Sequence, residues 1–396
     1  MATKLPGWIR VVYIALFLDL FGFGMLIPDI QLRADALKAP GWLIGLMLAS
    51  TFIIQVPISP HWGKLSDRIG RKPVFLACTA FSAAGMLCYG LAGTIPLMIL
   101  SRILSGFGGA NVAVAQALVA DGTPAEARTI AMGRIGAAVT VGLIGGPVAG
   151  GFIGEHLNSH WVGYLAGAGS ALGGLLVWMF VPTQKPEPQA CPPRKLLFDF
   201  GLLRELPQVR SIAIVATIAW FSLATLEGTF GRLIKQTMGF GKDEFGIIFG
   251  YESLIAFFVQ AFLLAWIIKR IKDFKLLRLG YLMQGLGLAI TPFAFLFPFQ
   301  SLWLVVLLLI STIYALGAGI SGPTVNSLAS NLTPDARQGE LFGLLQGTRS
   351  VGFIVGPILG GILFDWYYAA PYILAGMTCV VAAMILRKAE PKAKET

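Results

Sequence analysis

The feature that most constrains this chain is a series of twelve apolar segments, each long enough to cross a lipid bilayer as a helix. A spanning helix needs about 20 predominantly apolar residues, and these segments reach that length with few charges inside them. The sequence therefore predicts an all-α polytopic membrane protein. The segments lie at residues 9–28, 42–61, 74–92, 95–117, 131–154, 161–181, 211–232, 245–267, 276–297, 302–325, 340–364 and 369–386.

Composition excludes the main alternatives. Of the 396 residues, 56% are hydrophobic and only 13% are charged, whereas globular domains carry roughly 25% charged residues. A soluble enzyme or a disordered protein would need more charge. An outer-membrane barrel is excluded because its strands of about ten alternating residues would not give apolar runs of this length.

The distribution of basic residues predicts the orientation in the membrane. Of the 30 Lys and Arg residues, 23 lie at the two ends or in the even-numbered connections, counting those in the adjoining first turn of a segment, and Lys64 and Arg68 after the second segment are examples. Basic loops are retained in the cytoplasm, so we expect both termini on the cytoplasmic side. The membrane expected is a cell membrane, the bacterial inner membrane. The net charge of +10 is then an orientation signal that contacts anionic lipid, and no nucleic-acid partner is expected.

The chain divides into two similar halves. A Pro-rich, charged stretch at 182–210 separates residues 1–181 from residues 211–396, and we predict a cytoplasmic linker between two six-helix bundles. A G-x8-G-x3-G-P-x2-G-G pattern in the fifth segment recurs 210 residues later with identical spacing in the eleventh. Parallel repeats of this kind are typical of transporters with a central site between the halves. The first copy consists of Gly133, Gly142, Gly146, Pro147, Gly150 and Gly151.

Glycines at every fourth position line one face of a helix and allow close backbone approach. The repeated pattern suggests that both halves use this crossing to seal against each other. A tight helix crossing with no further function is the alternative.

Several motifs resemble those of the major facilitator superfamily. The run GKLSDRIGRKP at 63–73 matches that family's loop signature at every position, between the second and third segments. Arg102 followed by the glycines of 106–109 resembles its fourth-span motif, and the pattern in the fifth segment resembles its antiporter signature. The stretch 19–28 is similar to the first span of the tetracycline and multidrug:proton antiporter branch. The resemblance implies two pseudo-symmetric six-helix bundles around a central cavity.

Two departures from the family pattern matter. The second-half loop at 269–275 lacks the glycines and the aspartate of the loop signature, so any role of that motif rests on the first half. The ninth segment carries Gln284 and no acid, whereas tetracycline exporters resemble one another in having an acidic residue there. The resemblance therefore does not extend to tetracycline itself as the substrate.

The loop after the second segment is interpreted as a conformational latch. A carboxylate at Asp67 can face the positive end of a neighbouring helix, and the resemblance implies that this is the start of the eleventh segment, near Glu340. Arg71 could then bridge to Asp121. The alternative is a charge run that only orients the helix. The latch residues are Gly63, Asp67, Arg68, Gly70, Arg71 and Asp121.

Five charged residues lie inside the segments at least five residues from either end, where each costs at least ~2.5–3.5 kcal/mol unless it faces protein or water. Asp19 and Arg102 are predicted to form a pair, and Glu227 and Glu252 share a depth. With Arg349, three acids face two bases, which leaves one carboxylate without a fixed partner. Such a group suits a proton carrier, so all five are candidate proton- and substrate-coupling residues. A static buried ion pair is the alternative for each.

Uncharged polar and aromatic residues supply candidates for the lining of the cavity, with lipid-facing or interhelical positions as the alternative. No cofactor, metal site or catalytic residue is expected, because no Walker loop, nucleophile triad or zinc spacing occurs. The lining candidates are Phe23, Gln55, Asn111, Gln116, Trp220, Phe230, Tyr251, Gln260, Asn326 and Gln346.

These features favour a monomeric secondary transporter rather than an enzyme: a proton-coupled antiporter that exports small amphiphilic compounds or drugs by alternating access. The alternatives on the same scaffold are a lipid or lysolipid transporter and a sugar or metabolite carrier. A non-transporting membrane sensor or scaffold would need soluble signalling domains, for which the ten-residue ends leave little room. An integral-membrane enzyme would need a Glu/His constellation at one membrane face, which the sequence does not suggest.

Overall fold

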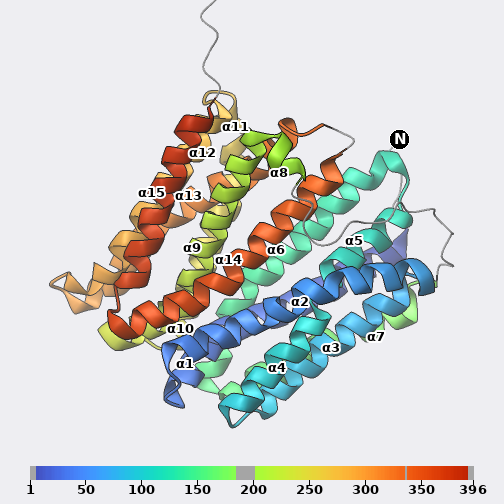
Figure 1. The fold of residues 1–396 in the computed structure, drawn as a ribbon. Helices are drawn as coiled ribbons and strands as arrows, with labels where there is room; N and C mark the ends of the chain where they lie inside the picture. The colour runs from blue at the N-terminus through green and yellow to red at the C-terminus, as the bar shows by residue number, and fades with distance from the viewer. Residues whose placement is uncertain (1–5, 184–200, 335–336, 391–396) are drawn as a thin grey trace, which may run out of the picture. The chain divides into compact units, whose positions relative to one another are not determined.

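The computed structural model describes residues 6–183, 201–334 and 337–390, and within these ranges all regular structure is helical (Figure 1). The helices up to the central stretch are α1 (Gly7–Ala36), α2 (Gly41–Ile69), α3 (Arg71–Leu91), α4 (Ile95–Gly108), α5 (Asn111–Asp121), α6 (Ala125–His156) and α7 (Ser159–Phe180). Those after it are α8 (Gly201–Glu205), α9 (Pro207–Met238), α10 (Lys242–Phe258), η1 (Val259–Leu263), α11 (Leu264–Ile268), α12 (Asp273–Ile290), η2 (Thr291–Leu296), η3 (Gln300–Leu302), α13 (Trp303–Asn331), α14 (Gln338–Trp366) and α15 (Ala370–Ala389).

Twelve stretches of helix in the described ranges are long and apolar enough to cross a membrane, which confirms the predicted all-α polytopic fold. Several spans differ in detail from the prediction, three of them near residues discussed below. The first helix continues beyond residue 28 to Ala36. The fourth span is interrupted by a turn at Gly109 and Ala110, and the eighth contains the π-helical turn η1. Turns of this kind are frequent at functional sites.

The first compact unit comprises residues 1–39, 47–193 and 240–250. In it, α1 packs on α6 and α7, and α3 packs on α7 and α4 (Figure 1). One apolar cluster joins these helices, with Leu16 from α1, Phe75 from α3, Leu118 from α5 and Val177 from α7 all buried.

The second compact unit comprises residues 40–46, 194–239 and 251–396. Here α9 packs on α14 and α15, and α12 packs on α13 and α15, and Figure 1 shows α9, α14 and α15 running side by side. The pairing of α1 with α6 in the first unit and of α9 with α14 in the second follows the internal repeat. The predicted linker 182–210 falls largely on residues outside the described ranges, so that boundary stays a prediction.

Two helices divide between the units. Residues 41–46 of α2 belong to the second unit and the rest of α2 to the first. Residues 242–250 of α10 belong to the first unit and the rest of α10 to the second. These two helix starts occupy corresponding places in the repeat.

The repeated glycines pack each unit internally. A Cβ on Gly146 would come within 2.5 Å of the Phe21 carbonyl oxygen in α1, and one on Gly150 within 2.0 Å of that of Met25. In the second unit, a Cβ on Gly356 would meet the Phe221 carbonyl oxygen in α9 at 2.8 Å. Close approach of backbones is therefore the role of most of the pattern. Gly133, in contrast, has no atom within 4 Å of its added Cβ among the described residues.

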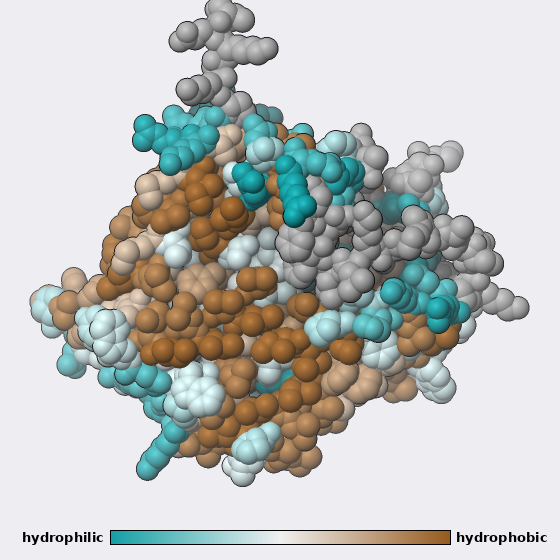
Figure 2. All heavy atoms as spheres, viewed as in Figure 1, coloured by the Kyte–Doolittle hydropathy of each residue, from teal (hydrophilic) through white to brown (hydrophobic). Residues whose placement is uncertain are grey.

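The surface is largely apolar. Figure 2 shows hydrophobic residues over most of the visible face and hydrophilic residues gathered towards helix ends. Large side chains are exposed on both units, including Trp178, Phe262 and Trp366. Apolar area of this extent is stable next to lipid rather than water.

Candidate coupling site

Asp19 lies in the interior of the first unit and is held by neutral hydrogen-bond donors. It is 7% exposed and sits on the stretch of α1 that packs against α7. Asn111 donates from Nδ2 to Asp19 Oδ2 at 2.9 Å, and Ser170 donates from Oγ to Asp19 Oδ1 at 2.6 Å. Both donors satisfy an ionised carboxylate without neutralising its charge.

The predicted pair between Asp19 and Arg102 is wrong in this structure. Helix α4 packs on α3 and directs the Arg102 guanidinium over the Tyr89 ring, 5.4 Å from its centroid. Because the chain turns between α4 and α5, it is Asn111 at the start of α5 that reaches Asp19 instead. Arg102 is 3% exposed, and its Nη2 has no hydrogen-bond partner within the described ranges.

A second carboxylate of α1, Asp29, was missed from the sequence. It is completely buried and forms an ion pair of 2.5 Å with Lys242 of α10. Tyr89 donates to Asp29 Oδ2 at 2.6 Å, and Ser159 donates to Oδ1 at 2.7 Å. The signal available was the pattern of a second aspartate ten residues after Asp19, but the first span was expected to end at residue 28.

In the second unit Glu227 and Glu252, which the sequence placed at a common depth, are near enough for their charges to interact. Ser311 of α13 donates to Glu252 Oε1 at 2.6 Å. Glu252 is 8% exposed. Beside it, the Tyr251 hydroxyl lies 2.8 Å from that of Thr312, also on α13.

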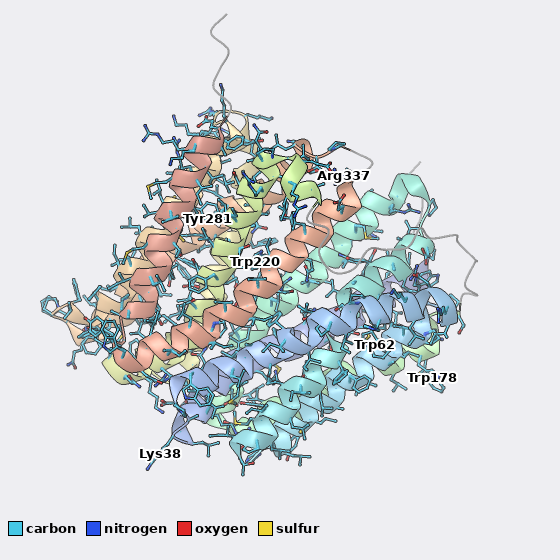
Figure 3. All side chains as sticks on the ribbon, viewed as in Figure 1. Lys38, Trp62, Trp178, Trp220, Tyr281 and Arg337 are labelled. Carbon is cyan, nitrogen blue, oxygen red and sulfur yellow. The ribbon has the colours of Figure 1, made fainter. Side chains whose placement is uncertain are left out.

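Arg349 of α14 supplies the cation of this second cluster. Its charge acts on Glu227, and its guanidinium lies 5.0 Å from the Trp220 ring centroid and 5.6 Å from that of Phe353. Figure 3 shows Trp220 on α9, beside α14. Aromatic faces attract a cation electrostatically, so the rings hold Arg349 beside the carboxylates. Trp220 was predicted as a lining residue, and part of its surface remains accessible.

Carboxylates cap the starts of the two divided helices. The backbone N–H of Gly41, the first residue of α2, donates to Asp365 Oδ2 at 2.6 Å, and Arg232 donates to Oδ1 at 2.8 Å. Likewise, the backbone N–H of Lys242 donates to Glu155 at 3.1 Å. A carboxylate at a helix start is favourable because it meets the positive end of the helix dipole. The correspondence of Glu155 with Asp365 was visible in the repeat.

The loop after α2 forms the contact predicted for Arg71. Its Nη1 donates to Asp67 at 2.5 Å, and its Nε donates to Asp121 at 3.1 Å. Gly70 turns the chain from α2 into α3 with φ of +100°, a region that favours glycine. Gly63 accepts a hydrogen bond from Ser66 through its carbonyl. Arg68 is exposed.

The expected neighbour of Asp67, Glu340 of α14, is occupied within its own unit. Glu340 accepts two hydrogen bonds from Arg337, at 2.7 and 2.9 Å, and Arg337 also pairs with Glu205. These bonds hold the pKa of Arg337 above its usual value. Figure 3 shows Arg337 at the amino end of α14. The latch role of Asp67 stays a prediction.

The lining candidates fall into three groups. Phe230 is 1% exposed and belongs to the packed interior of the second unit, so its predicted place on a cavity wall is wrong in this structure. Gln55 is used internally, donating to the Gly109 carbonyl oxygen at 2.7 Å, as Asn111 is towards Asp19. Phe23 and Tyr251 are partly exposed. The candidates with exposed side chains are Gln116, Gln260, Asn326 and Gln346.

Metal ligation has no support in the part of the chain that the structure describes, where no three His, Cys, Asp or Glu side chains gather as ligands. Gln284, the polar residue of the ninth span, accepts a hydrogen bond from Ser321 at 3.2 Å and so joins α12 to α13.

Comparison with known proteins agrees with this architecture. The sequence model of the Major Facilitator Superfamily matches residues 12–346 and, separately, 212–396. Multidrug resistance protein 1 of Bacillus subtilis (strain 168) is 26% identical over 370 residues, 92% of each chain. Tetracycline resistance protein, class D, of Salmonella ordonez is 27% identical over 365 residues, 90% of this chain and 89% of that protein.

Among solved structures, the nucleoside transporter NupG has a TM-score of 0.80 at 17% identity, covering 98% of this chain and 100% of that one. This likeness concerns the fold alone. The predicted resemblance to the tetracycline and multidrug branch is confirmed by the relatives. The chain belongs to the major facilitator superfamily and is a multi-pass membrane transporter, not an enzyme.

Proposed function

We propose that this transporter is a proton-coupled antiporter that exports small amphiphilic organic compounds by alternating access. The observation that carries the proposal is Asp19, a buried carboxylate in a membrane-spanning helix whose partners are the neutral donors Asn111 and Ser170. A charged side chain is costly at this depth. A carboxylate without a cation partner is therefore poised to take up a proton when its surroundings change.

Coupling follows if proton and substrate compete for the same charge. Uptake of a proton by Asp19 removes a buried negative charge from the first unit. A cationic or polar group of the substrate can instead offset that charge, so each ligand biases the same conformational equilibrium in place of the other. Inward movement of protons then drives outward movement of substrate.

The second unit offers a further proton site in the same scheme. The charge of Glu252 interacts with that of Glu227, and the charge of Arg349 acts on Glu227. Two carboxylates at close range cannot both ionise without cost. Trp220 and Phe353 beside Arg349 offer aromatic surface to an amphiphilic compound.

The names of the relatives support the substrate class. The similar proteins of Bacillus subtilis and Salmonella ordonez are named for multidrug and tetracycline resistance. The missing acid in the ninth span favours a multidrug spectrum over tetracycline itself. We further propose a monomer with cytoplasmic termini in the bacterial inner membrane, two six-helix bundles joined at 182–210, and the Asp67–Arg71–Asp121 cluster as a conformational latch.

The test is transport by the purified protein in proteoliposomes with an imposed pH gradient, screening cationic dyes, neutral drugs and lysolipids. Wild-type protein should accumulate at least one amphiphilic cation only when the gradient is present. Asp19→Asn should bind that substrate but lose gradient-driven accumulation, while substrate-for-substrate exchange persists. Accumulation that ignores the gradient and tolerates Asp19→Asn would remove the proton-antiport proposal. Uptake of lysolipids alone would favour the lipid-transport alternative.

A further inference from the structure

The hydrogen bonds of Asp19 have to suit two protonation states, because the proposed function requires its carboxyl group to gain and lose a proton inside the protein. A buried polar group left without a partner in either state costs free energy. In the structure, both partners donate to Asp19. This arrangement fits the ionised carboxylate, and a protonated acid would need one partner that accepts.

Asn111 could make that change only by turning its whole side-chain amide. Its amide nitrogen donates to Asp19 Oδ2, and an amide nitrogen cannot accept a hydrogen bond. Its Oδ1 points elsewhere and has no partner in the described part of the chain. Asn111 can nonetheless keep donating to Oδ2 when the proton is carried on Oδ1, because the carbonyl oxygen of an acid still accepts.

Ser170 can change from donating to the ionised carboxylate to accepting from the protonated acid. A hydroxyl both donates and accepts, and the Ser170 side chain is completely buried. Its Oγ lies 2.6 Å from Asp19 Oδ1 and also 3.5 Å from the carbonyl oxygen of Thr79, on α3. Helix α7 packs against both α1 and α3, as Figure 1 shows, which brings the two acceptors to the same hydroxyl.

We propose that Ser170 is the positioning residue for the proton on Asp19. Its hydroxyl donates to the ionised carboxylate, and when Asp19 Oδ1 is protonated it turns to donate to the Thr79 carbonyl oxygen and accepts from the acid. Ser170 keeps its own hydrogen throughout, and the only proton gained is the one on Asp19. Every group in the set Asp19, Ser170, Thr79 and Asn111 nitrogen then has a partner in both states.

Other groups near Asp19 do not take this role. The helices packed on α1 are chiefly α6 and α7, with smaller contacts from α3 and α5. On α3, the Asp19 carboxylate acts on the thiol of Cys78, which is uncharged when protonated and is not among the hydrogen-bond partners of Asp19. Arg102 is directed to Tyr89. Of the two partners of Asp19, the hydroxyl of Ser170 is therefore the one that can reverse its direction by moving its hydrogen alone.

The inference rests on the proposed proton uptake by Asp19, and infrared difference spectroscopy separates the two. The reconstituted protein is prepared with threonine labelled at the backbone carbonyl carbon, and spectra are compared across pH. In the wild type, the carboxylic acid band of Asp19 should appear as pH falls, together with a shift of one labelled carbonyl to lower frequency as it gains a hydrogen bond.

Four variants identify the bands. Asp19→Asn should remove both changes. Thr79→Val keeps the carbonyl but removes its label, so the acid band should remain while the labelled shift disappears. Ser170→Ala should also lose the labelled shift, and its acid band should appear about one pH unit higher, a tenfold gain in proton affinity. Ser170→Thr, which keeps the hydroxyl, should restore the wild-type midpoint.

The outcomes are distinguishable. An acid band of Asp19 that titrates without any labelled carbonyl shift overturns the Ser170 inference and leaves proton coupling standing. A labelled shift that persists in Ser170→Ala also overturns it. If no acid band of Asp19 appears at any accessible pH, the proton role of Asp19 fails, and the inference fails with it.

Discussion

The two units share a helix arrangement but hold their buried charges in different ways. In the first, Asp19 accepts from neutral donors while Arg102 lies apart from it. In the second, Glu227, Glu252 and Arg349 interact as one cluster. A proton on Asp19 therefore cancels a charge that is paired with no cation in the described part of the chain, whereas a proton in the second unit adjusts a cluster that already contains a cation. The repeat preserves packing and not chemistry.

The starts of α2 and α10, each grouped with a different unit from the rest of its helix, also differ in their charges. In both, a carboxylate accepts from the first backbone N–H, Glu155 for α10 and Asp365 for α2. The start of α10 has in addition a fully buried aspartate, Asp29, which pairs with Lys242, the first residue of that helix. Among the described residues, the start of α2 has no such aspartate. The start of α2 has glycine at that place, and its arginine, Arg232, comes from α9.

The largest expected effect is loss of the Asp29–Lys242 pair. Removing one partner of a buried ion pair leaves an uncompensated charge and costs about 3–5 kcal/mol. Asp29→Asn should therefore lower the free energy of unfolding by that amount, measured by denaturant unfolding in mixed micelles. The matched variant Asp365→Asn should cost about 1 kcal/mol, because Asp365 is 35% exposed in its pair with Arg232. Equal losses would show that burial does not distinguish the two clusters.

The sequence was sufficient for the framework because periodic apolar runs and glycine spacing are local signals. The twelve spans and the helix reversal at Gly70 follow from such signals, whereas the Arg71–Asp121 contact, between residues 50 positions apart, was expected only from the family resemblance. The predictions that failed concern the direction in which a side chain points. Asp19 and Arg102 were matched by estimated depth, but depth does not say which helix a side chain faces.

The same limit explains the other differences. Phe230 was assigned by residue type, whereas its place in the packed interior depends on the rotation of α9. Asp29 was overlooked because its importance depends on Lys242, more than two hundred residues away in the chain. Contacts between distant segments arise from the packing of helices, which a single sequence does not display.

The glycine faces should respond unequally to a methyl group. A Cβ on Gly150 would lie 2.0 Å from the backbone carbonyl oxygen of Met25, while its counterpart on Gly360 would lie 3.1 Å from the side-chain methyl of Thr225. Backbone cannot move aside as a side chain can. We expect Gly150→Ala to cost about 3 kcal/mol, the upper end for overpacking, and Gly360→Ala less than about 1 kcal/mol.

Thermal unfolding in detergent measures the difference, and Gly133→Ala provides the control. Its added Cβ would meet nothing within 4 Å in the described part of the chain, so the variant should be as stable as the wild type or slightly more so, since alanine favours helix. Similar losses for Gly150→Ala and Gly360→Ala would show that the two crossings are equally adaptable.

The two arginines inside the membrane spans, Arg102 and Arg349, should differ in their effect on the pH dependence of transport. Arg349→Ala removes the cation whose charge acts on Glu227. Without that cation the protonated form of Glu227 is favoured, so its proton is released only at higher pH. We expect the pH profile of gradient-driven transport to move upward by about one unit, equivalent to about 1.4 kcal/mol. Arg102→Ala should lower the rate but leave the position of the profile in place, because its guanidinium stacks on Tyr89. An upward shift in Arg102→Ala alone would restore the pairing with Asp19 that the sequence suggested.

The smallest expected effect concerns the loop clusters at the helix ends. Arg71 bridges Asp67 and Asp121 in the first unit, whereas the corresponding loop of the second unit directs Arg270 over the ring of Trp266 at 4.0 Å. The two aspartates are 40% and 45% exposed, and exposed pairs contribute about 0–1 kcal/mol each.

Asp121→Asn should therefore lower the unfolding free energy of the reconstituted protein by no more than about 1 kcal/mol. The distance over which exposed charges interact is about 10 Å at 0.1 M salt and becomes shorter as the salt concentration rises. The loss should therefore shrink towards zero in high salt. Arg270→Ala is the matched control, and because its contact is with a ring rather than with carboxylates, its effect should not follow the salt concentration in this way. If the cluster acts as a latch, Asp67→Asn should also slow turnover about fivefold with little change in substrate affinity, the shift that about 1 kcal/mol produces in a two-state equilibrium. A salt-independent loss in Asp121→Asn, with turnover unchanged in Asp67→Asn, would reduce the cluster to a structural turn and leave the difference between the two loops without a role in transport.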